Sequence, residues 1–493
     1  MIDDPIGGEG RVYRLPPRPA GTLVYGLPAG QIALGACGLL ALIVAASAIG
    51  GATGLAAGLL VAAGFAALAI VPIKGVPVYL VLPGAARFAR RGLAGANRAT
   101  LPLLAPPGVR RPSPSLTGLV LRGLPGPADD AAAAARGPSK GMRPAVDVGW
   151  FEDPRGGTAA AVLAVTGGPF ALAEPDAQDA ALAGWERVLA QFARETPPVQ
   201  LGWTVRTAPS SPELHLAWAG AGYQAPLGGS GYERLVRAAA AGQVSHDVYV
   251  TISQRTRLLR LRRIDTGAAI AAAAHVLGER LSAAGFTVDV LPAEDLADLA
   301  RHWADPHTAE ISDPTGIDGR DAHGCWDALR IGDSWHRTLW IPHWPAGDLR
   351  PGWLDPLLRD SAVTRTLTVW MTPVAARKSQ RRLNSDTVAV DTQLQLRSKH
   401  GLRVSTQLAD AHSHIQRRDA DLAAGHPELA YTGVLDVTAP SRAALDDACH
   451  TMADLAARTG LAPLRPALGR ADLAWPATLP GGRIPTRPRT GGL

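Results

Sequence analysis

The chain has 493 residues, a formal net charge of +6 and a hydrophobic content of 47%. A chain of this length is expected to hold about three domains. Its three cysteines, Cys37, Cys325 and Cys449, form no CxxC pair. They exclude a disulfide framework and favour a reducing compartment for the soluble part. The positive balance permits contact with nucleic acid, anionic lipid or an acidic partner, without selecting among them.

An apolar block near the N-terminus predicts a membrane hairpin at residues 23–74, after a cytosolic segment at 1–22. No charged residue occurs from Pro19 to Ile73. Runs 27–48 and 52–73 are each long enough to span a bilayer, which needs roughly 20 apolar residues. The glycines of "AIGGATG" between them suit a tight turn. The alternative is a buried hairpin of a soluble core. A cleaved signal peptide is disfavoured because a second apolar run follows at once.

The charges that flank the hairpin predict its orientation. Arg11, Arg14 and Arg18 precede it, and no acidic residue occurs from 75 to 128. By the positive-inside rule both termini lie in the cytoplasm and the protein crosses the plasma membrane twice. Residues 75–140 are expected to form a basic juxtamembrane connector and linker. Within it, Arg90 and Arg91 are either contacts with anionic lipid or simple determinants of topology.

Beyond the connector, the pattern of strands and helices predicts an α+β fold with ferredoxin-like split βαβ units. We expect a first cytosolic domain at 141–310, a second at 311–478 with a long helical insertion, and a disordered tail at 479–493. Strands are expected at 143–152, 157–167, 199–208, 245–253, 286–292, 334–345, 364–374, 428–440 and 461–466. Helices are expected at 175–195, 267–285, 352–360, 375–424 with a break near Gly401, and 441–460.

Two common catalytic motifs are missing from the sequence. No Gly-Lys-Ser/Thr occurs, so the phosphate-binding loop of a P-loop ATPase is absent, and no HExxH is present. Adjacent residues of a strand point to opposite faces, so Ser245, His246 and Asp247 do not predict a triad. We expect no enzymatic activity, no cofactor and no metal.

Two further groups of chelating residues also fail as metal sites. Asp321, His323 and Cys325 lack a second ligand pair at the spacing of a zinc site. His412 and His414 lie on a predicted helix, where their spacing turns the two rings to different faces. We expect these histidines to be solvated.

Two surfaces are candidates for binding. Tryptophans cluster at Trp335, Trp340, Trp344, Trp353 and Trp370. They favour a core with an adjoining interaction surface, carried by Trp340, Trp344 and Trp353, over a platform that stacks nucleic-acid bases. The second candidate is a basic cluster formed by Arg377, Lys378, Arg381 and Arg382. It is a solvated face, a lipid contact or a docking patch for an acidic partner.

Three stretches carry a family resemblance: "HRTLWIPHWPAGDLRPGWLDPLL", "TRTLTVWMTPVAARKSQRRL" and "YTGVLDVTAPSRAALDDAC". With the two-span hairpin, they resemble an actinobacterial membrane protein family of conjugation and type IV secretion loci. That family resembles a fusion of the PrgI-type two-helix membrane subunit with the N-terminal, non-ATPase domain of the conjugation ATPase. The resemblance implies that a separate P-loop ATPase docks here, and it implies no catalytic residues. The membrane subunit of type VII secretion shares the same topology and is the rival resemblance.

We therefore expect a non-catalytic, membrane-anchored scaffold of a secretion or conjugation apparatus. Its expected partners are a separate P-loop ATPase, other envelope subunits, the lipid bilayer and further copies of itself. The alternatives are a membrane subunit of type VII secretion, a membrane-tethered enzyme with a perturbed pKa in a cleft, and a membrane-tethered nucleic-acid-binding protein with salt-dependent affinity.

Overall fold

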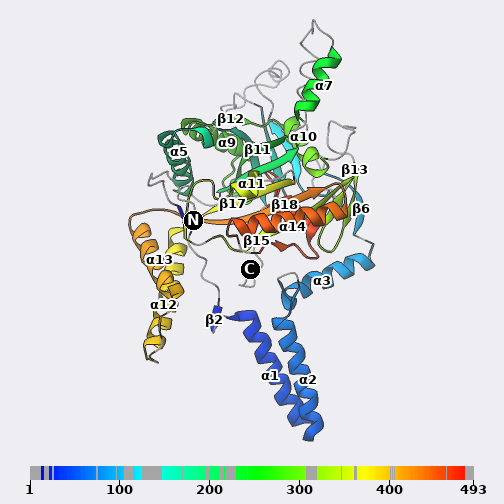
Figure 1. The fold of residues 1–493 in the computed structure, drawn as a ribbon, viewed down its shortest axis with the longest axis vertical. Helices are drawn as coiled ribbons and strands as arrows, with labels where there is room; N and C mark the ends of the chain where they lie inside the picture. The colour runs from blue at the N-terminus through cyan, green and yellow to red at the C-terminus, as the bar shows by residue number, and fades with distance from the viewer. Residues whose placement is uncertain are drawn as a thin grey trace, which may run out of the picture.

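Two helices project from a body built on one large β-sheet (Figure 1). The computed structural model describes the following residues: 13–15, 22–24, 27–73, 76–95, 97–104, 115–124, 147–168, 170–194, 199–209, 216, 229–240, 243–306, 319–345, 347–359, 363–399, 401, 403–404, 406–461 and 463–483.

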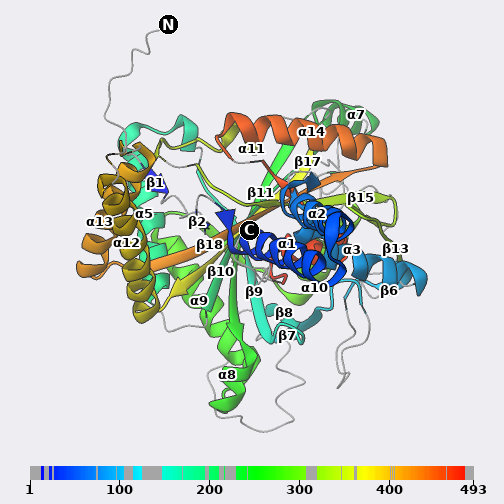
Figure 2. The ribbon, with the colours of Figure 1, turned by 90° about the horizontal axis from the view of Figure 1, so that it is seen from below.

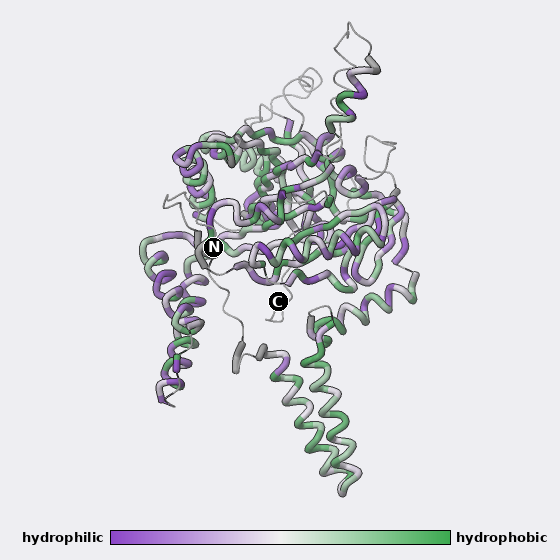
Figure 3. Tube along the Cα trace, in the orientation of Figure 1, coloured by the Kyte–Doolittle hydropathy of each residue, from purple (hydrophilic) through white to green (hydrophobic). Residues whose placement is uncertain are grey.

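The projecting helices are the predicted apolar hairpin. Helix α1 spans Ala29–Ile49 and α2 spans Gly51–Ile70. The turn between them needs glycine, because Gly50 and Gly51 have φ angles of 69° and 61°, which side chains disfavour. Both helices are long and apolar enough to cross a membrane, and just 6% and 17% of their apolar windows are buried. A hairpin inside a soluble core would be mostly buried, so the exposure argues against that alternative. Figure 3 shows the two helices as a hydrophobic projection.

Small residues let the two helices approach closely. A Cβ atom added at Gly58 would lie 3.0 Å from the backbone oxygen of Leu42. A Cβ atom at Gly54 would lie 2.7 Å from the backbone oxygen of Ala45. By contrast, nothing lies within 4 Å of the corresponding position at Gly64. Close packing through small residues is typical of helix pairs in lipid.

We expect Gly58→Leu to separate the two helices, because the new side chain would collide with the α1 backbone, at a cost of roughly 1–3 kcal/mol. Gly64→Leu is the matched control, since its side chain meets open space. The measurement is the rate of disulfide crosslinking between cysteines placed at Gln31 and Ala69, with Cys37 replaced by serine. Gln31 Nε2 donates to the Ala69 carbonyl at 2.8 Å, so these positions are in contact. Equal crosslinking rates in the two leucine variants would contradict the packing.

One sheet of 13 strands forms the centre of the body. Its main order is β6-β13-β14-β15-β18-β17-β10-β11-β9-β8-β7, with β12 on β9 and β19 on β15. The strands are β6 (Arg98–Pro102), β7 (Val120–Leu124), β8 (Val148–Asp153), β9 (Thr158–Thr166), β10 (Val199–Pro209), β11 (Val244–Arg255), β12 (Thr287–Val290), β13 (Gly319–Gly324), β14 (Leu329–Ile331), β15 (Ser334–Ile341), β17 (Thr364–Val374), β18 (Glu428–Ala439) and β19 (Arg465–Pro466).

The sheet contains two ferredoxin-like units of the kind that the sequence predicts. The first has the chain order β9, α5 (Pro175–Arg194), β10, β11, α9 (Thr266–Ala283), β12. Its strands lie in the order β12-β9-β11-β10, with antiparallel pairing throughout. The second repeats this order as β15, α11 (Asp355–Arg359), β17, β18, α14 (Arg442–Arg458), β19. Its strands lie in the order β19-β15-β18-β17. The fold is therefore α+β, as predicted.

The two units join through their equivalent edge strands. Strand β10 pairs antiparallel with β17, with Val205 opposite Leu367. Strands from both predicted domain ranges, 141–310 and 311–478, thus belong to a single sheet. The helices α5, α9, α11 and α14 cover one face, where residues of both units form one hydrophobic core; Leu201, Ile270 and Leu435 are among its fully buried members.

Each unit carries an insertion between its second and third strands. In the first unit the insertion includes α7 (Gly229–Ala240). In the second it is a pair of helices, α12 (Ala376–Lys399) and α13 (Thr406–Ala423), which we call the arm. Because β10 and β17 are antiparallel, the insertions leave from opposite ends of the sheet. Figure 1 shows α7 pointing away from α1 and α2, whereas the arm extends on their side of the body.

The opposite face of the sheet is covered by α10 (Ala293–Ala304) and by the chain after Leu468. The predicted disordered tail begins at 479, but its first residues are packed. Leu479 is buried, and Arg483 pairs with Asp153 at 2.8 Å. Residues 479–483 therefore complete this second core, because an apolar side chain and a buried carboxylate hold them. The rest of the tail lies outside the described residues.

The predicted connector at 75–140 also contributes to the body. Its described parts contain an amphipathic helix, α3 (Val78–Leu93), and the strands β6 and β7. Strand β6 pairs with β13, and β7 pairs with β8. The remaining described elements are β1 (Tyr13–Leu15), β2 (Thr22–Val24), β3 (Leu27–Pro28), β4 (Pro72–Ile73), β5 (Val76–Pro77), η3 (Phe170–Leu172), α8 (Thr256–Leu261), β16 (Gly347–Leu349), α15 (Ala471–Ala474) and η4 (Trp475–Ala477).

Candidate membrane and partner surfaces

Three polar side chains of the apolar hairpin form hydrogen bonds to backbone carbonyl groups within the hairpin. Gln31 bonds to the Ala69 carbonyl, Ser47 Oγ donates to the Val44 carbonyl at 3.0 Å, and Thr53 Oγ1 donates to the Gly50 carbonyl at 3.4 Å. In hydrocarbon an unpaired polar group costs several kcal/mol. The hairpin is therefore compatible with lipid over its whole length, and its exposed apolar surface makes it the candidate membrane surface.

Helix α3 lies between this hairpin and the body (Figure 1). It packs on the body closely: a Cβ atom at Gly84 would lie 3.1 Å from the Leu468 carbonyl oxygen, and the Phe88 ring meets Trp326 edge-on at 5.6 Å. Of the two predicted lipid contacts, Arg91 turns to the body and pairs with Asp472 at 2.8 Å. Arg90 is exposed. Arg91 therefore helps to hold α3 on the body, whereas Arg90 is exposed on the same helix.

The basic cluster lies at the root of the arm, on the first turns of α12. Arg377, Lys378 and Arg381 are exposed, and Arg382 is half-buried. Ser379 and Leu383 on the same helix are buried, so the helix turns this side to its neighbours and the cations outward. Salt bridges within the described part of the chain use none of the four cations. This leaves their charge available to a partner.

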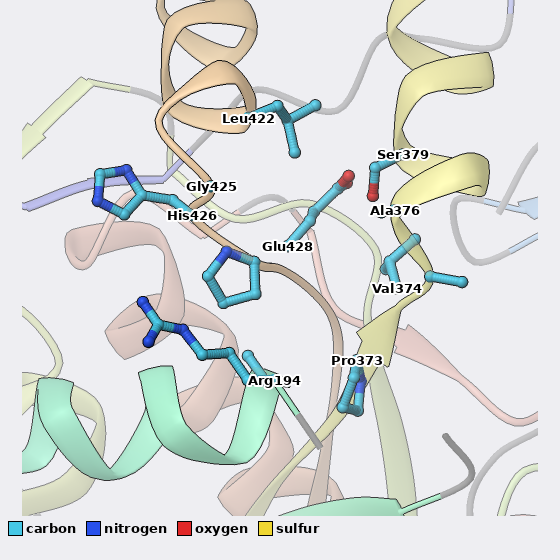
Figure 4. Close-up of a pocket in the computed structure, with 12 residues that line it drawn as sticks. Arg194, Pro373, Val374, Ala376, Ser379, Leu422, Gly425, His426 and Glu428 are labelled. Atoms are coloured by element: carbon cyan, nitrogen blue, oxygen red, sulfur yellow. The ribbon is translucent and has the colours of Figure 1, made fainter. Parts of the chain in front are cut away.

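A pocket of about 400 Å³ lies beside this root. It is formed where the ends of α5, β17 and α13 meet the start of α12 (Figure 4). Arg194, His426 and Glu428 are among its lining residues. Glu428 is already engaged, since it accepts two hydrogen bonds of 3.0 Å from Arg418. The pocket is best described as the junction of arm and body.

The predicted tryptophan surface is mostly a rim of the core. Trp344 meets Trp353 edge-on at 6.2 Å and Tyr431 at 5.5 Å, and all three pack against the main core. Trp340 is half-buried on β15. Trp370 is fully buried, and its Nε1 donates to the Ala477 carbonyl at 2.9 Å. Packing of this kind favours the core interpretation over a stacking platform.

The three contiguous residues that resemble a triad do not converge. His246 Nδ1 lies 3.1 Å from Thr207 Oγ1, whereas Ser245 Oγ donates to the Ala208 carbonyl at 3.4 Å. Burial, with help from Arg365, lowers the pKa of His246, and burial raises the pKa of Asp247. Both pKa shifts disfavour the charged forms of His246 and Asp247, and a catalytic triad requires those charged forms.

The other two constellations are equally unsuited to metal binding. Cys325 Sγ lies 4.0 Å from His323 Nδ1, and Asp321 accepts a hydrogen bond of 2.5 Å from Thr100. His412 lies 4.0 Å from Asp391 across the arm. In the segments given above, no group of three His, Cys, Asp or Glu side chains is arranged to hold a metal ion.

Sequence reasoning missed the buried polar centre of the second unit. His336 on β15 and Asp436 on β18 are fully buried, with Nδ1 and Oδ2 2.9 Å apart. The second ring nitrogen of His336 lies 2.8 Å from the Ala304 carbonyl oxygen, and Asp436 also accepts hydrogen bonds from Thr338 and Thr438. The sequence offered one signal for this centre: each of the two strands has a polar residue, His336 or Asp436, at a position that faces inward. The network joins β15 and β18 to the end of α10 and is structural.

A buried arginine was missed as well. Arg206 lies over the Trp303 ring at 4.5 Å and donates to the His302 carbonyl at 3.1 Å. Burial lowers the pKa of Arg206 to about 10. It therefore stays charged at neutral pH and ties β10 to α10.

Comparison with known proteins bears on part of the chain. Residues 259–341 match a family described as "Putative type VII ESX secretion system translocon, EccE". The matched stretch covers well under half of the chain and runs from the end of α8 through α9, β12, α10, β13 and β14 to the end of β15. No curated protein matches the chain. The match and the two apolar helices associate the chain with membrane components of secretion systems, and the match alone supports the type VII resemblance.

Proposed function

We propose that this protein is a non-catalytic, membrane-anchored component of a type VII secretion apparatus. The observation that carries the proposal is the match to the translocon family at 259–341, in a chain that also has two exposed apolar helices. In this proposal α1 and α2 anchor the protein in the plasma membrane, with both termini in the cytoplasm. The sheet body is a rigid platform for other subunits.

The cations beside the hairpin support this proposed orientation. Arg87 and Arg90 are exposed and Arg91 is half-buried on α3, the helix that follows the second span. Lysine and arginine close to a span favour its cytoplasmic side. The body would then face the cytoplasm, where an ATPase is available as a partner.

We further propose that a separate P-loop ATPase docks on the root of the arm. The chain has no phosphate-binding loop of its own, which supports a separate subunit as the source of energy for transport. The exposed cations Arg377, Lys378 and Arg381 suit an acidic partner surface, and charge complementarity of this kind steers association. A conjugation or type IV apparatus is the second candidate, favoured by the three sequence stretches that resemble that family.

The proposal predicts the outcome of a pull-down from native cells in mild detergent, analysed by mass spectrometry. We expect a P-loop ATPase and other envelope subunits to accompany the full chain, and further copies of the chain itself. Charge reversal of Arg377, Lys378 and Arg381 to Glu should reduce ATPase recovery about tenfold or more, because like charges would then face each other.

The same experiment separates the alternatives. Recovery of the chain alone, even after crosslinking, would overturn the scaffold proposal in favour of a free-standing membrane protein. Equal ATPase recovery with and without charge reversal would show that the ATPase does not dock on the root of the arm. The identity of the recovered subunits decides between type VII secretion and conjugation.

A further inference from the structure

The outer end of the arm carries a second basic surface, distinct from the root. From residue 392 to residue 409 the sequence contains Arg397, Lys399 and Arg403 and no carboxylate. Lys399 and Arg403 are exposed, and Arg397 is half-buried with one guanidinium nitrogen 3.1 Å from the Arg403 carbonyl oxygen. We call these three residues the arm tip. Cations without neighbouring acids form a local positive field.

Apolar side chains are exposed beside these cations. Leu396 is 51% exposed and Val404 is 43% exposed. Long basic side chains mixed with exposed apolar ones are typical of surfaces that lie at a lipid headgroup layer, where the charge meets phosphate and the apolar part enters the acyl boundary. A solvated helix end has no need of the apolar residues.

The arm tip points toward the membrane side of the molecule. Figure 1 shows the arm and the α1–α2 hairpin extending from the body in the same direction, and the view from below in Figure 2 shows that they lie apart across it. Helix α12 has 24 residues, so the arm is about 36 Å long at a rise of 1.5 Å per residue. Helix α3, about 10 Å in diameter, is the element between the body and the hairpin. The arm is therefore long enough to reach past α3.

Helix α3 presents a similar mixture of side chains on this side. Leu82 is 46% exposed and Leu93 is 92% exposed, and the exposed Arg90 lies between them in sequence. Two separate elements on the membrane side of the body thus combine exposed cations with exposed apolar residues. This agreement favours a common partner, and lipid is the partner that both would meet.

We propose that the arm tip binds the anionic headgroups of the membrane that holds α1 and α2, and so fixes the body's tilt above the bilayer. The inference rests on the hairpin spanning a membrane and is independent of the secretion role. Each cation near an anionic surface strengthens binding roughly fivefold, so the three together contribute on the order of a hundredfold. Arg381 is 16 positions before Arg397 along α12, about 24 Å. That exceeds a Debye length of about 8–10 Å, so the root adds little.

The test uses the full chain reconstituted in lipid nanodiscs. Cys37, Cys325 and Cys449 are replaced by serine, and an environment-sensitive dye is attached to a Ser398→Cys substitution at the tip. With anionic phosphatidylglycerol in the disc we expect a blue-shifted emission that 0.5 M salt reverses. Discs of phosphatidylcholine alone should give the emission of a water-exposed dye. Co-elution of protein and disc confirms, separately, that the hairpin has inserted.

Two variants with the same loss of charge make the test specific. Arg397→Gln, Lys399→Gln and Arg403→Gln together should abolish the blue shift in anionic discs. Arg377→Gln, Lys378→Gln and Arg381→Gln together should leave it unchanged. A water-exposed dye in anionic discs that have incorporated the chain would overturn the inference and direct attention to an acidic protein partner. An equal loss of the shift in both variants would also overturn it.

Discussion

The Asp436→Ala variant is expected to unfold at a much lower urea concentration than the wild-type protein. Asp436 and His336 are 1% and 0% exposed, and the carboxylate accepts hydrogen bonds from two threonines besides facing the imidazole. Removing one partner of a buried pair leaves the other uncompensated in a medium of low dielectric constant. Such a loss costs about 3–5 kcal/mol, a large fraction of the stability of an ordinary domain.

The measurement is the urea midpoint of the detergent-purified chain, followed by tryptophan fluorescence. Trp475 reports directly, because its ring meets His336 at 5.4 Å. Asp419→Ala is the control: Asp419 is exposed on the arm, and its loss should change stability by less than about 0.5 kcal/mol. Asp436→Asn, which preserves shape and one acceptor, should fall between the two. Similar midpoints for Asp436→Ala and Asp419→Ala would contradict the structural role of the network.

The second large effect concerns the hairpin. Leu40 and Leu60 lie near the middle of α1 and α2 and are 62% and 76% exposed. If these faces contact lipid, Leu40→Lys with Leu60→Lys places two charges near the bilayer centre. Each costs about 2.5–3.5 kcal/mol on insertion scales, so the pair costs about 5–7 kcal/mol. We expect the double variant to be released from membranes by alkaline carbonate, whereas the wild-type chain stays in the pellet.

The matched control is a variant with two Leu→Lys substitutions outside the hairpin. Leu235 on α7 and Leu261 on α8 are 67% and 71% exposed. Their replacement by lysine should leave the chain in the pellet. Retention of the Leu40→Lys, Leu60→Lys variant in the membrane would indicate that α1 and α2 are not surrounded by hydrocarbon.

The parts of the fold that the sequence predicts are those with local signals. The hairpin follows from an uncharged stretch with glycines at its turn, and the two ferredoxin-like units follow from alternating strands and helices of ordinary length. Even the short β19, of two residues, lies within a predicted strand. Each of these elements is specified by its own periodicity and by the turn residues beside it.

The elements that were missed depend on partners far away in the sequence. Strand β6 is followed by a proline-rich segment and becomes a strand through pairing with β13, more than 200 residues later. The His336–Asp436 pair joins residues 100 positions apart, and Arg91 meets Asp472 across 381 positions. Periodicity carries no information about such contacts. The direction of the arm could not be predicted from the sequence either, because it depends on the antiparallel pairing of β10 with β17.

The segment from Trp475 to Arg483 has a consequence for the order of assembly. It closes the second face of the sheet by bonding to residues from across the body, including Thr251, Thr368, Trp370 and Asp153. During synthesis the hairpin emerges first and can enter the bilayer while the body is still incomplete. The sheet face that this segment covers stays open until translation has passed residue 483. A hairpin that inserts while it is being synthesised would therefore hold the nascent body at the membrane before this sheet face closes.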